Sequence, residues 1–168
     1  MAKKQASSVH AAFMKAARDG DFEGVRHYFE EGASLESRDE QGRTAMHIAA
    51  ERGFSKTINI LVELGANVNA TDHQKETPLH RAAKQSHGAD TAALLILNGA
   101  DITIKNRFGD TAFTMVKQEN RTKQVLRGAW LAALEKNPLD LSIVTDHDIV
   151  IGKSMNVKRR IQPQTPGA

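Results

Sequence analysis

The sequence TPLHRAA, residues 77–83, decides the fold of this chain. Thr77 is a favourable helix N-cap, because its hydroxyl can accept from the free N–H groups of the first turn. Pro78 follows at the first helical position, where its missing N–H costs nothing and its fixed φ suits a helix. Leu79 and the two alanines form a narrow apolar stripe. The stretch therefore predicts a helix start that packs closely against neighbouring elements.

The same motif recurs at a constant spacing. TAMHIAA occupies residues 44–50, and TAFTMV at 111–116 is a degenerate copy. The three threonines that begin these motifs are 33 and then 34 residues apart. Two further markers follow the same steps, namely the Gly-Ala pairs that begin at residues 32, 65 and 99, and the series Asp39, Asp72 and Asn106. Three independent markers with one period indicate an internal repeat.

A period near 33 residues that contains Thr-Pro-Leu-His resembles the ankyrin repeat. The resemblance covers about residues 8–137. It implies antiparallel helix pairs stacked side by side, with hairpin-like loops projecting at a right angle. It also implies binding of other proteins through a concave surface, without catalysis.

We therefore predict an all-α ankyrin-repeat solenoid of about four repeats, two internal and two capping. The first unit lacks the Thr-Pro motif, and the fourth replaces the histidine by Thr114 and the second alanine by Lys117. Terminal units of a solenoid have one face without a neighbour, so atypical residues are expected there. The predicted organisation is a disordered N-terminus over 1–8, a repeat domain over 9–137, and a C-terminal extension with a basic flexible tail over 138–168.

Apolar spacing predicts helices over residues 9–18, 22–31, 45–52, 56–64 and 122–136. Repeat three departs from the pattern in two ways. Lys75 stands where the hairpin needs glycine, and a left-handed backbone there would cost roughly 1–2 kcal/mol. One extra residue near 86–89 predicts a local loop adjustment between the two helices of this repeat.

The C-terminal extension lies outside the repeat pattern. Residues 142–152 carry β-branched side chains on both sides of an Asp-His-Asp centre, which predicts a small hairpin or an extended strip. Beyond Ser154 the chain is polar, basic and proline-containing, and we expect disorder.

Composition excludes several classes of protein. The chain has 0 Cys, so disulfides and thiolate sites are ruled out. Residues 1–120 carry 15 basic and 16 acidic side chains, which disfavours a nucleic-acid-binding repeat face. No apolar run approaches the length of a membrane span, and no apolar segment follows the N-terminal lysines as in a secretory signal. We expect a cytoplasmic location, with secretion as an effector the alternative.

The resemblance also implies which residues contact a partner. They are the two variable residues after each Asp or Asn of the loops and the two after each alanine pair of the first helices. On the loops these are Glu40, Gln41, His73, Gln74, Arg107 and Phe108, and on the helices Arg18, Asp19, Glu51, Arg52, Lys84 and Gln85. Phe108 is the most informative, because aromatic and arginine side chains dominate interface energies. The alternative is that Phe108 folds back onto Phe113 or the preceding loop.

No motif indicates catalysis, a cofactor or a metal site. His47 and His80 occupy the same repeat position, and the resemblance implies that each links neighbouring repeats by hydrogen bonds. The other histidines lack a ligand spacing such as His-Glu-x-x-His. We therefore expect a non-enzymatic module that binds, and regulates or inhibits, one protein partner. The alternative is a scaffold whose extension, 138–168, binds the partner or pairs two chains, the repeat protein being otherwise a monomer.

Overall fold

A computed structural model describes residues 2–86, 88–118 and 120–136 of the chain. The predicted hairpin over 142–152 and the basic tail lie outside these residues. Residues up to Ala132 form one unit, which contains the repeats, and residues from Ala133 onward belong to a second.

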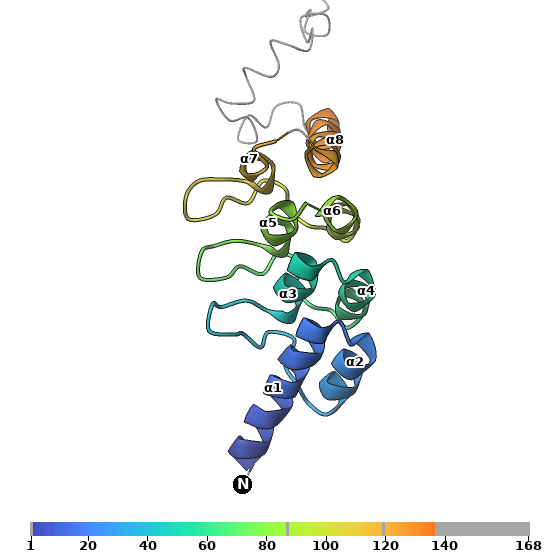
Figure 1. Cartoon of the computed structure of the whole chain (residues 1–168), viewed down its shortest axis with the longest axis vertical. Coiled ribbons are helices and arrows are strands. Elements are labelled where there is room, and N and C mark those ends of the chain that lie inside the picture. Colours follow the sequence, from blue (N-terminus) through green and yellow to red (C-terminus); the bar gives the residue numbers. More distant parts are fainter. Residues whose placement is uncertain (1, 87, 119, 137–168) are drawn as a thin grey trace, which may run out of the picture. The chain divides into compact units, whose positions relative to one another are not determined.

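The described residues contain eight helices and no strand, which confirms the all-α prediction. The helices are α1 (Ala2–Asp19), α2 (Phe22–Glu30), α3 (Ala45–Arg52), α4 (Ser55–Glu63), α5 (Pro78–Ala83), α6 (Gly88–Leu97), α7 (Ala112–Met115) and α8 (Arg121–Lys136). Figure 1 shows α1, α3, α5 and α7 in one row and α2, α4 and α6 in a second row beside it. Long loops leave the first row on the side away from the second.

Helix α1 begins earlier than the sequence pattern indicates. We expected a disordered terminus over 1–8 and a helix from Val9, whereas residues 2–8 are helical and continue into the rest of α1. This segment consists mainly of Ala, Lys, Gln and Ser, and the first three are strong helix formers. Extending an existing helix requires no new nucleation, so strong helix formers can add turns to it.

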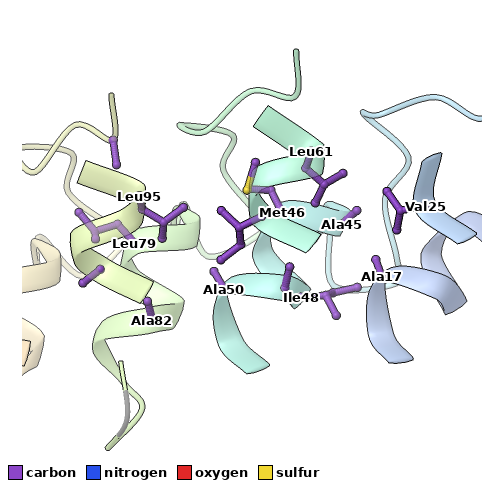
Figure 2. Close-up of a cluster of buried hydrophobic side chains, with 14 of the residues drawn as sticks. Ala17, Val25, Ala45, Met46, Ile48, Ala50, Leu61, Leu79, Ala82 and Leu95 are labelled. Atoms are coloured by element: carbon purple, nitrogen blue, oxygen red, sulfur yellow. The ribbon is translucent and has the colours of Figure 1, made fainter. Parts of the chain in front are cut away.

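Small side chains allow neighbouring repeats to approach closely. Helix α3 packs on α1 and α5, and α5 packs on α7, so the extensive contacts within the first row join neighbouring helices. Ala17, Ala49 and Ala82 are fully buried at these junctions. Larger side chains of the second row, such as Ile58 and Leu61 of α4, are fully buried as well. Figure 2 shows buried side chains of successive repeats, among them Ala17, Leu61 and Ala82, which belong to one hydrophobic cluster.

The recurring histidine links each internal repeat to the next. Nδ1 of His47 accepts from the backbone N–H of Thr44 at 3.2 Å, and Nε2 donates to the carbonyl oxygen of Glu76 at 2.9 Å. His80 repeats the arrangement with Thr77 at 3.2 Å and with the carbonyl of Asp110 at 3.1 Å. The structural role that the resemblance implied for both histidines is confirmed.

Three hairpin-like loops, 39–43, 72–76 and 106–110, have the same construction. In the first, Oδ1 of Asp39 accepts from the N–H groups of Gln41 and Arg43 at 3.0 and 2.9 Å. Asp72 and Asn106 serve their own loops in the same way. The fourth residue of each loop has positive φ, and in repeat three this residue is Lys75 with φ 57°. The left-handed lysine predicted from the sequence is therefore present.

The extra residue of repeat three shortens its first helix. Helix α5 ends at Ala83 and α6 begins at Gly88, whereas α3 extends to Arg52 and α4 begins at Ser55. Gly88 lies so close to α5 that an added Cβ would meet the Ala82 carbonyl oxygen. Helix α5 still packs on α3, α6 and α7, so the predicted loop adjustment leaves the stack intact.

Candidate functional site

The twelve residues singled out in the sequence lie on two features of the first row. We call the loop tips together with the exposed ends of α1, α3 and α5 the inner face. The tips carry Glu40, Gln41, His73, Gln74, Arg107 and Phe108, all exposed. The helix ends carry Arg18, Asp19, Arg52 and Lys84, which are exposed, and Glu51 and Gln85, which are partly buried.

Backbone hydrogen bonds join the loop tips into one surface. The N–H of His73 donates to the carbonyl of Gln41 at 3.1 Å, and the N–H of Arg107 donates to the carbonyl of Gln74 at 2.9 Å. The His73 ring also lies directly against Gly42, where an added Cβ would be 2.4 Å from its Cδ2. The tips are thus held at fixed positions, which lowers the entropy lost when a partner binds.

Phe108 is presented to solvent at the tip of the last loop. Its side chain is 65 % exposed, so it does not fold back onto Phe113. The Arg107 guanidinium lies 4.9 Å from the centre of its ring, within the range of a cation–π contact. An exposed aromatic with a stacked arginine is a typical interface anchor.

Glu51 and Lys84, two of the predicted contact residues, form ion pairs with residues at the base of a loop. Oε2 of Glu51 lies 2.7 Å from an Arg43 guanidinium nitrogen, and Nζ of Lys84 lies 2.7 Å from Oε1 of Glu76. Arg43 and Glu76 occupy equivalent repeat positions, as do Glu51 and Lys84, so the same pair occurs with its charges exchanged. These ion pairs neutralise Glu51 and Lys84, which reduces their value for attracting a charged partner.

The repeat-three pair belongs to a larger buried cluster. Arg81 bridges the carboxylates of Asp72 and Glu76, and the Glu76 side chain is only 1 % exposed. Burial raises the pKa of Asp72, but the hydrogen bonds from Arg81 and from two backbone N–H groups outweigh it and hold the pKa below its usual value. For the Arg81 guanidinium, burial lowers the pKa and the Asp72 carboxylate raises it, with a net increase. Asp72 and Arg81 are therefore both ionised, and the cluster fixes the base of the second loop.

A hollow of about 270 Å³ opens on the inner face across three repeats. Its lining comes from the end of α1, the base of the first loop, α3 and the turn after α5, namely Arg18, Arg43, Ile48, Glu51, Arg52 and Gln85. The structure thus brings together four of the twelve predicted residues. A second hollow, of about 370 Å³, is lined by α1 and residues 37–39, and Arg18 belongs to both.

Arg18 and Arg52 differ from the other cations of this region. No hydrogen bond or ion pair to another described residue engages either guanidinium. Arg43 holds Glu51, and Arg38 donates to the carbonyls of Gly42 and Thr71. Asp19, beside Arg18, pairs with Lys15 at 3.7 Å. The hollow therefore has two uncompensated positive charges.

Sequence reasoning did not select Arg38, Arg43 and Ile48, which also line these hollows. These three residues lie outside the variable positions that follow each Asp or Asn and each alanine pair. The family pattern therefore does not select them as partner contacts. One signal was available: Arg43 and Glu51 stand one period before Glu76 and Lys84 with opposite charges. Such an exchange indicates a pair in contact.

We find no group of three His, Cys, Asp or Glu side chains arranged to hold a metal among the residues that the structure describes. Within the same residues, no helix has the length and apolarity needed to cross a bilayer.

Comparisons with known proteins agree with the geometry. Residues 13–106 match a family model described as ankyrin repeats in three copies. The chain is similar to ankyrin repeat domain-containing protein 46 of rat and mouse, with 41 % identity over 121 residues in each case. Identity to the zebrafish protein of the same name is 44 % over 121 residues. These alignments cover 72 % of this chain and 51 % of each relative, so the chain spans about half the length of the relatives it matches.

Proposed function

Because this chain belongs to the ankyrin repeat family, we propose that its inner face binds and regulates one protein partner. Ankyrin repeats are protein-interaction modules. The partner contacts the three loop tips and the hollow between α1, α3 and the end of α5. The twelve residues named from the sequence are the proposed contacts, with Phe108 as the apolar anchor.

The exposure of Phe108 is the observation that carries this proposal. An apolar ring at a loop tip gains nothing for folding stability when it is 65 % exposed. The loop is nevertheless fixed by its own hydrogen bonds and by the bond from Arg107 to Gln74. A rigidly held, exposed aromatic can bury its surface only against another molecule.

Substitution of Phe108 tests the location directly. We would isolate the partner by affinity capture from the native cell and measure its affinity by calorimetry. Phe108→Ala and Arg52→Glu are each expected to weaken a 1:1 complex by about tenfold or more. Leu97→Ala is the matched apolar control, because Leu97 is 84 % exposed but lies at the end of α6 in the second row. Unchanged affinity in both inner-face variants would refute the assignment.

We further propose that the inner face inhibits the partner by covering the surface on which the activity of the partner depends. This binding would take place in the cytoplasm. The competing proposal places binding or self-association in residues 138–168, on the strength of the β-branched stretch 142–152. Truncation after Asn137 separates the two. Unchanged partner affinity and an unchanged mass in light scattering would exclude the extension as the functional element.

A further inference from the structure

We propose that the hollow between Arg18 and Arg52 receives an acidic side chain, Asp or Glu, of the protein partner. The inference rests on the proposed function, since it names the chemistry of a partner that binds the inner face. It depends on the charges around the hollow and on which of them are already compensated.

Every acidic group that lines the two hollows is already engaged with Arg43. Glu51 accepts from Arg43 at 2.7 Å, and Oδ2 of Asp39 lies 2.8 Å from another nitrogen of the same guanidinium. Burial raises the pKa of Asp39, but hydrogen bonds from Arg43 and from backbone N–H groups lower it below its usual value. Both carboxylates are thus occupied by Arg43, and neither contacts Arg18 or Arg52.

Among the four arginines that line the two hollows, two already contact acceptor groups of the chain and two do not. Arg43 is held by two carboxylates, and Arg38 donates to two carbonyl oxygens and lies 3.7 Å from Glu36. Arg18 and Arg52 have no such partner within the described part of the chain. With the four arginines, Asp39 and Glu51 counted together, the two hollows carry a net charge of +2. The surplus lies on the two available arginines.

Ile48 is the apolar residue of the lining of this hollow. A carboxylate that enters here would meet the forked N–H groups of arginine and would bring only a short aliphatic stem. The volume of about 270 Å³ accommodates one such side chain together with backbone.

Arg18 lines both hollows, which extends the inference from a side chain to a chain segment. A stretch of partner backbone can cross from the hollow beside residues 37–39 to the one beside α3 with Arg18 between them. The acidic residue is expected near the middle of this segment.

Peptide selection tests the inference before any partner has been isolated. The full chain is used to select from a phage-displayed library of random peptides of about 12 residues, long enough to cross three repeats when extended. We expect enrichment of Asp or Glu at one position. A synthetic peptide of the selected sequence should bind Arg18→Gln and Arg52→Gln roughly tenfold or more weakly, since a hydrogen bond to a charged group is worth at least about that factor.

Two matched controls isolate the charge contact. Arg26→Gln removes an exposed arginine whose partner is Glu63 and which does not line either hollow, so it should leave peptide affinity unchanged. The peptide with Asn or Gln in place of its acidic residue should bind the parent protein and the double variant Arg18→Gln/Arg52→Gln with equal affinity. Thermal melts check that both exposed substitutions leave the fold intact.

Four outcomes would overturn the inference. They are failure to select any peptide, selected peptides without an acidic position, equal loss of affinity for acidic and amide peptides in the double variant, and tighter binding of a phosphoserine peptide than of the acidic one. If non-acidic peptides bind and Phe108→Ala abolishes their binding, the inner face remains the binding surface and only the carboxylate is wrong. If a captured partner ignores every inner-face substitution, the proposed function itself fails.

Discussion

The imidazole of His47 joins two repeats because its two ring nitrogens have different partners. Nδ1 accepts from the N–H of Thr44, so the proton stays on Nε2 and is donated to the Glu76 carbonyl. His80 has the same tautomer for the same reason. Thr114 occupies this position in repeat four, and its hydroxyl accepts from the N–H of Thr111 at 2.9 Å. The threonine hydroxyl can cap the helix as Nδ1 of histidine does. It has no counterpart of Nε2, which forms the link to the next repeat.

Replacement of His47 should therefore cost more than the loss of a buried ring. His47→Leu leaves the Glu76 carbonyl and the Thr44 N–H without these partners at fully buried positions. We expect a decrease in the free energy of unfolding of about 2–3 kcal/mol, measured by urea denaturation. His27→Gln, at an exposed position of α2, is the control and should change stability little. A loss below about 0.5 kcal/mol for His47→Leu would contradict the role given to the imidazole.

Both histidines also predict how stability depends on pH. Burial lowers the pKa of His47 and of His80 below 6.5, although the carbonyls they contact partly raise it. In the unfolded chain these rings take up protons as the pH falls through 6.5, whereas in the folded chain they resist protonation. The stabilisation is thus complete above the unfolded pKa and is lost progressively below it, by up to about 1.4 kcal/mol per pH unit for each ring.

Urea denaturation at about pH 7.5 and 5.5 measures this dependence. Unfolding should require less free energy at the lower pH, and His80→Leu should reduce the difference by about half. An equal free energy of unfolding at both pH values would mean that the buried rings take up protons in the folded chain as readily as in the unfolded chain.

At the scale of single elements, the three loops provide a natural comparison. Their fourth positions are Gly42, Lys75 and Gly109, all with positive φ. An added Cβ at Gly42 would lie 2.4 Å from the His73 ring, whereas at Gly109 it would meet nothing within 4 Å. All three positions require a left-handed backbone. Their surroundings differ because, within residues 2–86, 88–118 and 120–136, no further loop of this kind follows the last one.

A series of substitutions separates these two effects. Lys75→Gly should raise the free energy of unfolding by about 0.5–1 kcal/mol, because the left-handed strain exceeds the extra entropy of glycine. Gly109→Ala should lower it by about 1 kcal/mol through backbone strain alone. Gly42→Ala should lower it further, because His73 must also move. Thermal and urea melts give the order, and a Gly109→Ala loss larger than that of Gly42→Ala would contradict it.

The sequence predicted these elements to a large extent, and the reasons are physical. Helix starts were recognisable because the N-cap threonines and Pro78 act locally, and the period set every repeat boundary. The start of α1 was missed because residues 2–8 contain no apolar residue at helical spacing other than alanine, so no periodic signal marks them. The engagement of Glu51 and Lys84 was also missed. Their partners are eight residues away on a loop, and only the fold brings a loop base and a helix end together.

At the scale of the whole stack, each repeat is stabilised mainly by the repeats next to it. Helix α3 packs on α1 and α5, and α5 packs on α7, with no extensive contact between α1 and α5. Such a chain behaves as a one-dimensional series of repeats with interface energies. Damage at one junction should therefore remain local.

Hydrogen exchange measured by mass spectrometry tests this locality. His80→Leu removes the link to the Asp110 carbonyl and should speed exchange in the described residues beyond Pro78. Exchange in α3 and in α1 from Phe13 onward should stay close to that of the parent protein. A uniform increase over all helices would show instead that the repeats unfold as one cooperative unit.

The position of the binding hollow could be predicted only in outline. Family pattern placed the twelve residues on one surface, and four of them do line the hollow. Which arginines remain available could not be read from the sequence, because that depends on side chains that meet across repeats. Arg43 and Arg52 are both arginines near the same helix, yet only Arg43 reaches two carboxylates.

The attachment of each loop has a mechanical consequence. The second loop is fastened to the preceding repeat at its tip, through the His73 N–H, and at its base, through the Glu76 carbonyl. The third is fastened in the same two ways, through Arg107 and Asp110. A loop that is attached at two points cannot rotate about either of them. A force applied to the Phe108 ring is therefore transmitted to repeat three through both hydrogen bonds.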